Sequence, residues 1–134
     1  MKQILKLLSG LILLSVAGCD IDKLGPSYRA MWEKPGADST EVGKALLECG
    51  MPTPYSEDSE NREVSNNGWA TIHACMIQAG FHYKDQRGGG WCYTYKEENL
   101  PICRPGAVIP QRSVEKRLNS PFCKQHPEQY ECYP

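Results

Sequence analysis

Several hallmarks of catalytic and metal-binding proteins are absent from this chain of 134 residues. Only three histidines occur, and no cysteines or histidines have the C-x-x-C or H-x-x-x-H spacing that zinc sites use. No serine stands in a Gly-x-Ser-x-Gly turn, which is the setting of many nucleophilic serines. We therefore expect no metal, no cofactor and no catalytic residues.

A surplus of positive charge is also missing. The 15 Lys and Arg residues face 16 Asp and Glu residues. Because a nucleic-acid binder usually carries a basic patch or stripe, we expect no nucleic-acid partner. A long apolar run is missing as well. A membrane-spanning helix needs about 20 apolar residues, whereas the apolar stretch 4–17 is shorter and is interrupted by Lys6.

The N-terminal segment instead has the three parts of a secretory signal peptide. Lys2 and Lys6 give it a basic start, residues 11–14 form its apolar stretch, and the small residues Ala17 and Gly18 close it. This pattern predicts that the protein is exported and that residues 1–18 are a removable signal peptide.

The sequence Val16-Ala17-Gly18-Cys19 resembles the lipobox of bacterial lipoproteins. The resemblance implies cleavage between Gly18 and Cys19, a diacylglycerol on the Cys19 thiol and acylation, for example with palmitate, of the new amino terminus. Two or more acyl chains hold a protein stably on a membrane. We therefore expect lipid anchoring on the periplasmic side of a cell membrane, with residues 19–31 as anchor and tether. Asp20 resembles the inner-membrane retention signal of enteric lipoproteins, although that rule is not general across bacteria.

A second resemblance covers about a third of the remaining chain. Residues 32–37 (WEKPGA) and 45–50 (ALLECG) are similar to small uncharacterised lipoproteins of Gram-negative bacteria. The shared pattern is a tryptophan, a Pro-Gly turn and a helix that ends in cysteine. The resemblance implies an envelope lipoprotein and carries no activity with it.

Six cysteines remain once Cys19 is reserved for lipid. An even number of cysteines in an exported domain indicates a disulfide framework. Each bridge contributes roughly 2–4 kcal/mol, which would supplement a core with few aliphatic residues. Sequence alone does not choose the connectivity, but a bridge between the apolar stripes of two neighbouring helices is favoured. The favoured pairs are Cys49–Cys75, Cys92–Cys103 and Cys123–Cys132.

Residues 32–134 are predicted to form a disulfide-rich globular domain of the α+β class, with two to three short helices and a β-hairpin. Asp38 begins a capping box ahead of an apolar stripe, which predicts a helix over 39–49. A second helix is expected to be capped by Asn66 or Asn67 and to end at Gly80.

Weaker local signals complete the secondary structure. Residues 51–66 are polar and acidic, and we expect a mobile loop there. Ser113 is expected to cap a short third helix that ends at the Pro121 segment. Pro127 favours one last turn through Tyr130.

Aromatic residues dominate two segments that flank a glycine-rich stretch. Residues 81–83 and 91–95 have β-favouring types, and glycines between them allow a tight turn, so a β-hairpin is predicted. In a strand, alternate side chains share a face. That face would hold Trp91, Tyr93 and Tyr95. We expect these rings to pack on the helices as the main core; the alternative is that they form an exposed binding face.

The functional hypothesis that follows is a lipid-anchored, non-catalytic binding or structural module of the cell envelope. It would have the membrane as one partner, through Cys19, and an envelope protein as another. Two alternatives stay open: an interference protein, which inhibits a hydrolase or excludes phage or plasmids, and a small envelope hydrolase.

Overall fold

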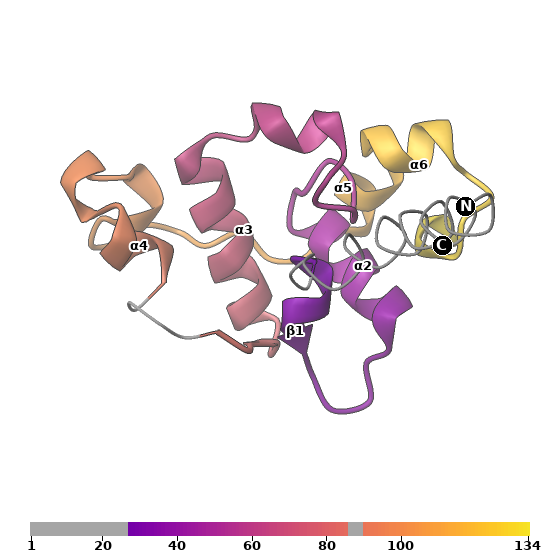
Figure 1. The fold of residues 1–134 in the computed structure, drawn as a ribbon, viewed down its shortest axis with the longest axis horizontal. Helices are drawn as coiled ribbons and strands as arrows, with labels where there is room; N and C mark the ends of the chain where they lie inside the picture. The colour runs from indigo at the N-terminus through magenta and orange to yellow at the C-terminus, as the bar shows by residue number, and fades with distance from the viewer. Residues whose placement is uncertain (1–26, 86–89) are drawn as a thin grey trace, which may run out of the picture.

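The computed structural model describes residues 27–85 and 90–134. Val16, Gly18, Cys19 and Asp20, on which the lipobox prediction depends, lie outside the described residues, as does most of the predicted hairpin tip. None of the helices within these ranges has the length and apolar character that a membrane span requires. In chain order (Figure 1) the elements are η1 (Arg29–Met31), β1 (Trp32–Glu33), α2 (Ser39–Glu48), η2 (Ser59–Glu63), α3 (Asn66–Gln78), β2 (His82–Tyr83), α4 (Trp91–Thr94), η4 (Lys96–Glu98), η5 (Pro101–Cys103), α5 (Val114–Leu118), α6 (Pro121–Gln125) and η6 (Tyr130–Cys132).

Helix α2 forms where its capping signal predicts it. The Asp38 carboxylate accepts a hydrogen bond from the Glu41 backbone N–H at 2.9 Å, so one of the free amides of the first turn is satisfied. Val42, Ala45 and Leu46 recur on one helix face and are buried. The prediction of a helix over 39–49 is confirmed to within one residue.

Helix α3 is also present, but its cap differs from the prediction. The Ser65 hydroxyl accepts from the Gly68 N–H at 3.0 Å, whereas Asn66 and Asn67 are the first two helical residues. Asn67 is freed by this shift, and its side-chain oxygen accepts from the N–H of Ile102 at 2.9 Å. The helix therefore starts one or two positions earlier than expected and uses an asparagine to hold a distant segment.

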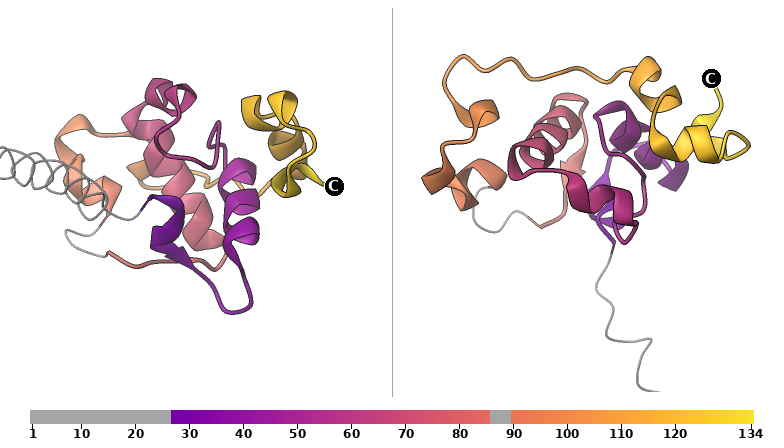
Figure 2. Two further views of the ribbon diagram at one scale, coloured as in Figure 1. Left: turned by 45° about the vertical axis from the view of Figure 1, so that its right-hand side comes forward. Right: turned by 90° about the horizontal axis from the view of Figure 1, so that it is seen from above.

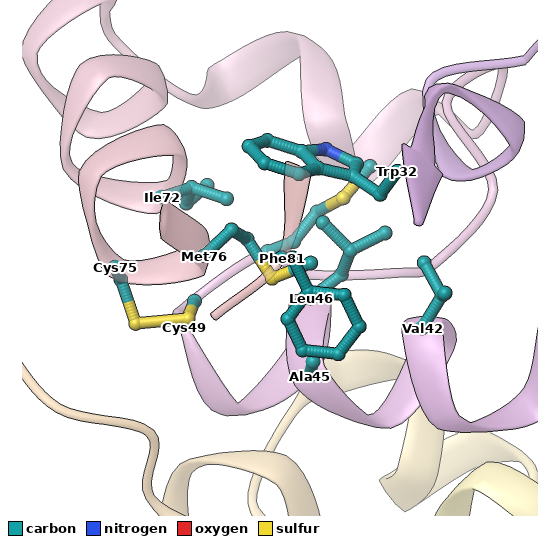
Figure 3. Close-up of a cluster of buried hydrophobic side chains, with 10 residues drawn as sticks. Trp32, Val42, Ala45, Leu46, Cys49, Ile72, Cys75, Met76 and Phe81 are labelled. Atoms are coloured by element: carbon teal, nitrogen blue, oxygen red, sulfur yellow. A yellow bond between two sulfur atoms is a disulfide. The ribbon is translucent and has the colours of Figure 1, made fainter. Parts of the chain in front are cut away.

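The main core lies between α2 and α3 (Figure 3). Trp32 covers the top of the cluster, and Leu46, Met76 and Phe81 fill it. A disulfide between Cys49 and Cys75 closes one side, with both cysteines buried. The chain is thus a small α+β domain that is held by disulfides, and the three bridges join the same pairs that the sequence favours: Cys49–Cys75, Cys92–Cys103 and Cys123–Cys132.

The sheet differs from the predicted hairpin. Strand β2 pairs antiparallel with β1, with Trp32 opposite Tyr83, and residues 91–94 form helix α4 instead of a second hairpin strand. The partner strand therefore comes from about fifty residues upstream. Local β propensity at 91–95 loses to two tertiary contacts, a disulfide from Cys92 and stacking of Trp91 on α3.

The expectation that Trp91, Tyr93 and Tyr95 form the main core is wrong. None of the three belongs to the buried cluster between α2 and α3. Trp91 and Tyr95 are half-buried, and Tyr93 is 60% exposed. A helical turn, unlike a strand, points these positions in different directions.

The segment 51–66, which was predicted to be a mobile acidic loop, is held together by internal hydrogen bonds. Asn61 is buried, and its side-chain nitrogen donates to the carbonyl oxygen of Tyr55 at 2.7 Å. The Asn61 side-chain oxygen accepts from the N–H of Thr53 at 3.2 Å. One asparagine thus satisfies backbone groups on the opposite side of the segment, and a 3-10 turn, η2, surrounds it.

The C-terminal residues form a unit that packs on the outer side of α2, where Leu47 contacts a second buried cluster of Phe122, Cys123 and Cys132. Ser113 caps α5 as predicted. Pro121 was expected to end that helix; instead it starts α6, which Ser120 caps. Proline fits the first helical turn because the N–H that it lacks has no partner there.

A buried charge network joins this unit to α2. Oε2 of Glu48 accepts from Nε of Arg117 at 2.8 Å, and Oε1 accepts from Nε of Arg112 at 3.0 Å. Nη1 of Arg117 also donates to the carbonyl oxygens of Glu131 and Tyr133. The Arg117 side chain is 4% exposed, so this single guanidinium connects α2, α5 and the C-terminal segment.

The folded unit begins before residue 32. Tyr28, which was expected in the tether, packs against the main core. Arg29 crosses α2 and donates to the Glu131 carboxylate at 2.9 Å. A Cβ on Gly43 would lie 2.9 Å from the Arg29 guanidinium carbon, so the glycine leaves room for this crossing.

Candidate functional site

Helix α3 supplies one wall of the candidate site. Trp69 and His73 lie four residues apart, so they share one face of the helix. His73 is buried and its ring lies 4.8 Å from Trp32 and 5.1 Å from Tyr83, measured between ring centroids. Residues on β1, β2 and α3 thus form one continuous aromatic group.

Helix α4 supplies the opposite wall. Its first residue, Trp91, stacks on Trp69 with 6.2 Å between centroids and 9° between ring planes. Tyr95 stacks on Trp91 at 5.2 Å and 15°. The disulfide from Cys92 to Cys103 ties this short helix to η5. Figure 1 shows α4 beside α3, at the end of the molecule away from α5 and α6.

Between the two walls lies a cleft of about 230 Å³. We call it the aromatic cleft; it is lined by His73, Tyr83, Asp85, Gly90, Trp91, Thr94 and Tyr95. Gly90 adopts a φ of +85°, which favours glycine. Ligand pockets for drug-sized molecules usually measure about 300–1,000 Å³, so this cleft fits a single functional group or one ring.

A second cleft of about 340 Å³ adjoins the first, because both are lined by His73, Gly90 and Trp91. We call it the apolar cleft; its other lining residues are Ala70, Ala74, Ile77, Gln78, Cys92 and Ile109. Ile109 belongs to the segment that runs from η5 past α3 to α5 (Figure 2). Nε2 of Gln78 donates to the carbonyl oxygen of Pro110 at 3.1 Å and holds this segment beside α3.

Within residues 27–85 and 90–134, three buried polar atoms beside the aromatic cleft have no hydrogen-bond partner: Tyr28 Oη, Trp32 Nε1 and His73 Nδ1. Buried polar groups usually find a partner, so this concentration is unusual. Burial raises the pKa of the Tyr28 hydroxyl, and the neighbouring Trp32 side chain lowers it by a smaller amount. The two groups are not aligned well enough to form a hydrogen bond. Burial also lowers the pKa of His73 from its ordinary value of 6.5. His73 is therefore neutral at pH 7.

The buried His73 should make stability depend on pH. In the unfolded chain the imidazole binds a proton near pH 6.5, whereas in the folded chain it does so only at lower pH. The unfolded state then holds more protons between the two pKa values, so the free energy of unfolding falls as pH drops below about 6.5. His73→Phe should flatten this dependence between pH 7.5 and 5.5 in thermal unfolding.

A matched control for this prediction is His126→Gln, because the His126 side chain is 49% exposed. This variant should keep the pH dependence of the unaltered protein. Equal slopes for the His73→Phe variant and the unaltered protein would show that His73 does not carry the effect.

The three rings singled out from the sequence have different positions. Trp91 and Tyr95 line the aromatic cleft, whereas Tyr93 lies outside it under the Lys96 ammonium, 5.1 Å from the ring centroid. His73, Tyr83 and Asp85 were not predicted as site residues. The sequence does show a histidine on an apolar helix, followed by an aromatic strand. This pattern could have indicated a site, but it does not reveal that α4 packs over these residues.

No other constellation with clear chemistry stands out in residues 27–85 and 90–134. No group of three or more His, Cys, Asp or Glu residues there could hold a metal ion. Ser113 and Lys116 have the Ser-x-x-Lys spacing of some serine acyl enzymes. The Ser113 hydroxyl, however, accepts from the Lys116 backbone N–H and caps α5.

Comparisons with known proteins found no matching family model, no similar curated protein and no similar solved structure. The functional argument therefore depends on the residues themselves.

Proposed function

We propose that the protein is a lipid-anchored module of the bacterial cell envelope that binds a ligand without converting it. The main support for this proposal is the way in which the seven cysteines of the chain are distributed. Six of them pair with one another in three disulfides. The one left outside these pairs, Cys19, is the cysteine that follows the signal-like segment and completes the lipobox resemblance.

The disulfides support an exported protein, since structural disulfides persist in oxidising compartments such as the periplasm. The binding role is supported by the aromatic cleft. It concentrates half-buried aromatic rings and buried, partnerless polar atoms at one end of a small domain. Rings that expose an edge or a face to a cleft are common in binding sites.

Cys19→Ala should abolish lipid attachment, because the thioether forms on the Cys19 sulfur. The precursor should also stay uncleaved, since processing of lipoproteins waits for that thioether. Metabolic labelling of cells with a palmitate analogue, followed by gel analysis, measures both effects. The expected result is loss of label and a precursor larger than the mature protein.

The matched control is the double variant Cys92→Ser/Cys103→Ser, which removes two cysteines that already pair with each other. It should incorporate label like the unaltered protein. Undiminished label in the Cys19→Ala variant would contradict lipidation at this residue.

A further inference from the structure

Two exposed tyrosine rings lie next to each other near the C-terminus. Tyr130 is 69% exposed and Tyr133 is 47% exposed, and their ring centroids are 5.5 Å apart. One exposed ring is ordinary on a protein surface, but adjacent large apolar groups in water often mark an interaction site. Figure 1 shows the C-terminal segment beside α2, at the end of the molecule away from α4. This surface is therefore separate from the aromatic cleft.

The two rings border a hollow of about 350 Å³. We call it the tyrosine hollow; it is lined by Asp38, Thr40, Glu41, Lys44, Tyr130 and Tyr133. Its volume lies at the lower end of the range of about 300–1,000 Å³ that is usual for ligand sites. The hollow therefore fits a ligand of one or two small rings.

The backbone beneath the rings is held in place. The carbonyl oxygen of Tyr133 accepts a hydrogen bond from Nη1 of Arg117, whose side chain is buried. Tyr130 begins η6, and Cys132 of the same turn is bridged to Cys123. A tyrosine side chain has only two torsions, so it offers a large contact area at a small cost in conformational entropy. The two rings thus form a preorganised surface for a ligand.

Helix α2 lines the rest of the hollow with polar side chains. Oδ1 of Asp38 caps the helix by accepting from the Glu41 N–H, so the hollow offers side chains here and not this backbone amide. Among residues 27–85 and 90–134, the other Asp38 oxygen, the Thr40 hydroxyl and both phenol groups have no hydrogen-bond partner. Nζ of Lys44 lies 3.8 Å from Oε1 of Glu41, beyond hydrogen-bond distance. The hollow thus contains both donors and acceptors that a ligand can use.

Net charge does not select the ligand of this hollow. Two of its side chains, Asp38 and Glu41, are negative, and Lys44 is positive. None of the three is buried, so water and salt screen their charges. Selection then depends on ring contact and hydrogen bonding. A sugar ring meets both demands, because its C–H groups form an apolar face for stacking on an aromatic ring and its hydroxyl groups both donate and accept.

We propose that the tyrosine hollow binds a sugar ring of a neutral glycan. The apolar face of the sugar stacks on Tyr130, the more exposed of the two rings. Its hydroxyl groups bond to the carboxylates of Asp38 and Glu41 and to the hydroxyl of Thr40. N-acetylated amino sugars and unsubstituted hexoses share this chemistry. The inference goes beyond the proposed function, since it assigns a second site that does not depend on the aromatic cleft.

The test uses the full chain in micelles of octaethylene glycol dodecyl ether, a detergent without sugar groups. The probes are cellobiose and N,N′-diacetylchitobiose, which distinguish the two sugar sources, and N-acetyl-lysine amide, a cation without a sugar. Saturation-transfer NMR measures affinity and shows which ligand protons touch the protein. At least one disaccharide should bind, with the strongest saturation on the C–H protons of one ring face. Its affinity should be equal at about 0.05 and 0.5 M sodium chloride, because stacking is not screened by salt.

Two substitutions of Tyr130 locate the stacking. Tyr130→Ala should weaken binding of the disaccharide at least about fivefold, the loss expected for one aromatic contact. Tyr130→Phe keeps the ring and should bind within about twofold of the unaltered protein. Because Tyr130 is exposed, both variants should unfold at an unchanged temperature. Tyr93→Ala is the matched control, since Tyr93 is also exposed but lies on α4, outside the hollow, and it should bind normally.

Failure of both disaccharides to bind would overturn the proposal, as would unweakened binding to the Tyr130→Ala variant. Disaccharide binding that is lost in Tyr95→Leu would overturn it as well, because the sugar would then occupy the aromatic cleft. N-acetyl-lysine amide that binds as tightly as the better disaccharide would assign the hollow to a cation instead. Lipid attachment is measured separately by the palmitate label, so the failure of either proposal is distinguishable from that of the other.

Discussion

Glu48→Leu is expected to lower the free energy of unfolding by about 3–5 kcal/mol, the range seen when one partner of a buried ion pair is removed. The Arg117 side chain is 4% exposed. In the variant its guanidinium keeps only the carbonyl oxygens of Glu131 and Tyr133 as acceptors. Leucine has a similar size, so the effect reports the uncompensated charge more than a cavity. Urea unfolding followed by circular dichroism measures it.

The matched control is Arg112→Met, which removes the other cation on the same carboxylate. The Arg112 side chain is 28% exposed, so its loss should cost about 1 kcal/mol or less. The double variant Glu48→Leu/Arg117→Met should recover much of the loss, because an apolar pair of similar volume often replaces a buried ion pair at little cost. A double variant less stable than Glu48→Leu alone would contradict this account.

The second large effect is expected from removal of the core disulfide. Cys49→Ala/Cys75→Ala should cost about 2–5 kcal/mol. The bridge closes 26 residues of chain, the longest separation of the three, so its loss gives the unfolded state the most freedom. Both sulfur atoms are also buried beside Met76 and Leu46, and their removal leaves unfilled space.

Cys92→Ala/Cys103→Ala serves as the comparison, because that bridge joins cysteines only 11 residues apart and Cys92 is exposed. Its removal should lower the unfolding temperature less than removal of Cys49–Cys75. Thermal unfolding of the two double variants under identical conditions decides the order. A larger loss from the Cys92–Cys103 pair would show that α4 contributes more to global stability than its burial suggests.

Local signals in the sequence predict the two main helices well. The Asp38 cap and the stripe of Val42, Ala45 and Leu46 lie within a few residues of one another, so one stretch of chain contains all that the helix needs. The alignment of these stripes also explains why the sequence favours a Cys49–Cys75 bridge: each cysteine lies on or beside the apolar stripe of its helix, and both are buried.

Contacts between distant residues were not predictable in this way. Strand β2 pairs with β1 across about fifty residues, and each strand is only two residues long, so neither leaves a period in the sequence. Glu48 has its partners 64 and 69 residues away. Isolated charged residues of this kind look the same in a sequence whether they face solvent or form a buried network.

The candidate site was predicted only in part, because it also depends on contacts between distant residues. Trp91 and Tyr95 were identified by their aromatic character, but as strand residues that either pack in the core or form an exposed binding face. Their placement depends on the stacking with Trp69 and on the disulfide of Cys92. Both contacts become visible only when α4 is folded against α3. Asp85 and His73 line a cleft only because α4 packs against α3.

Exposure differs sharply among the three disulfides. Cys92 is at the surface, whereas the cysteines of the other two bridges are buried. Thiol–disulfide exchange requires that a thiolate reach a sulfur atom, so a reductant should open Cys92–Cys103 first. Opening it would remove the covalent tie between η5 and α4, which carries Trp91 and Tyr95, while the Cys49–Cys75 bridge keeps the α2–α3 core closed. If the aromatic cleft binds a ligand as proposed, ligand capture would then depend on the redox state of the surroundings, and the domain would lose and regain that ligand without unfolding.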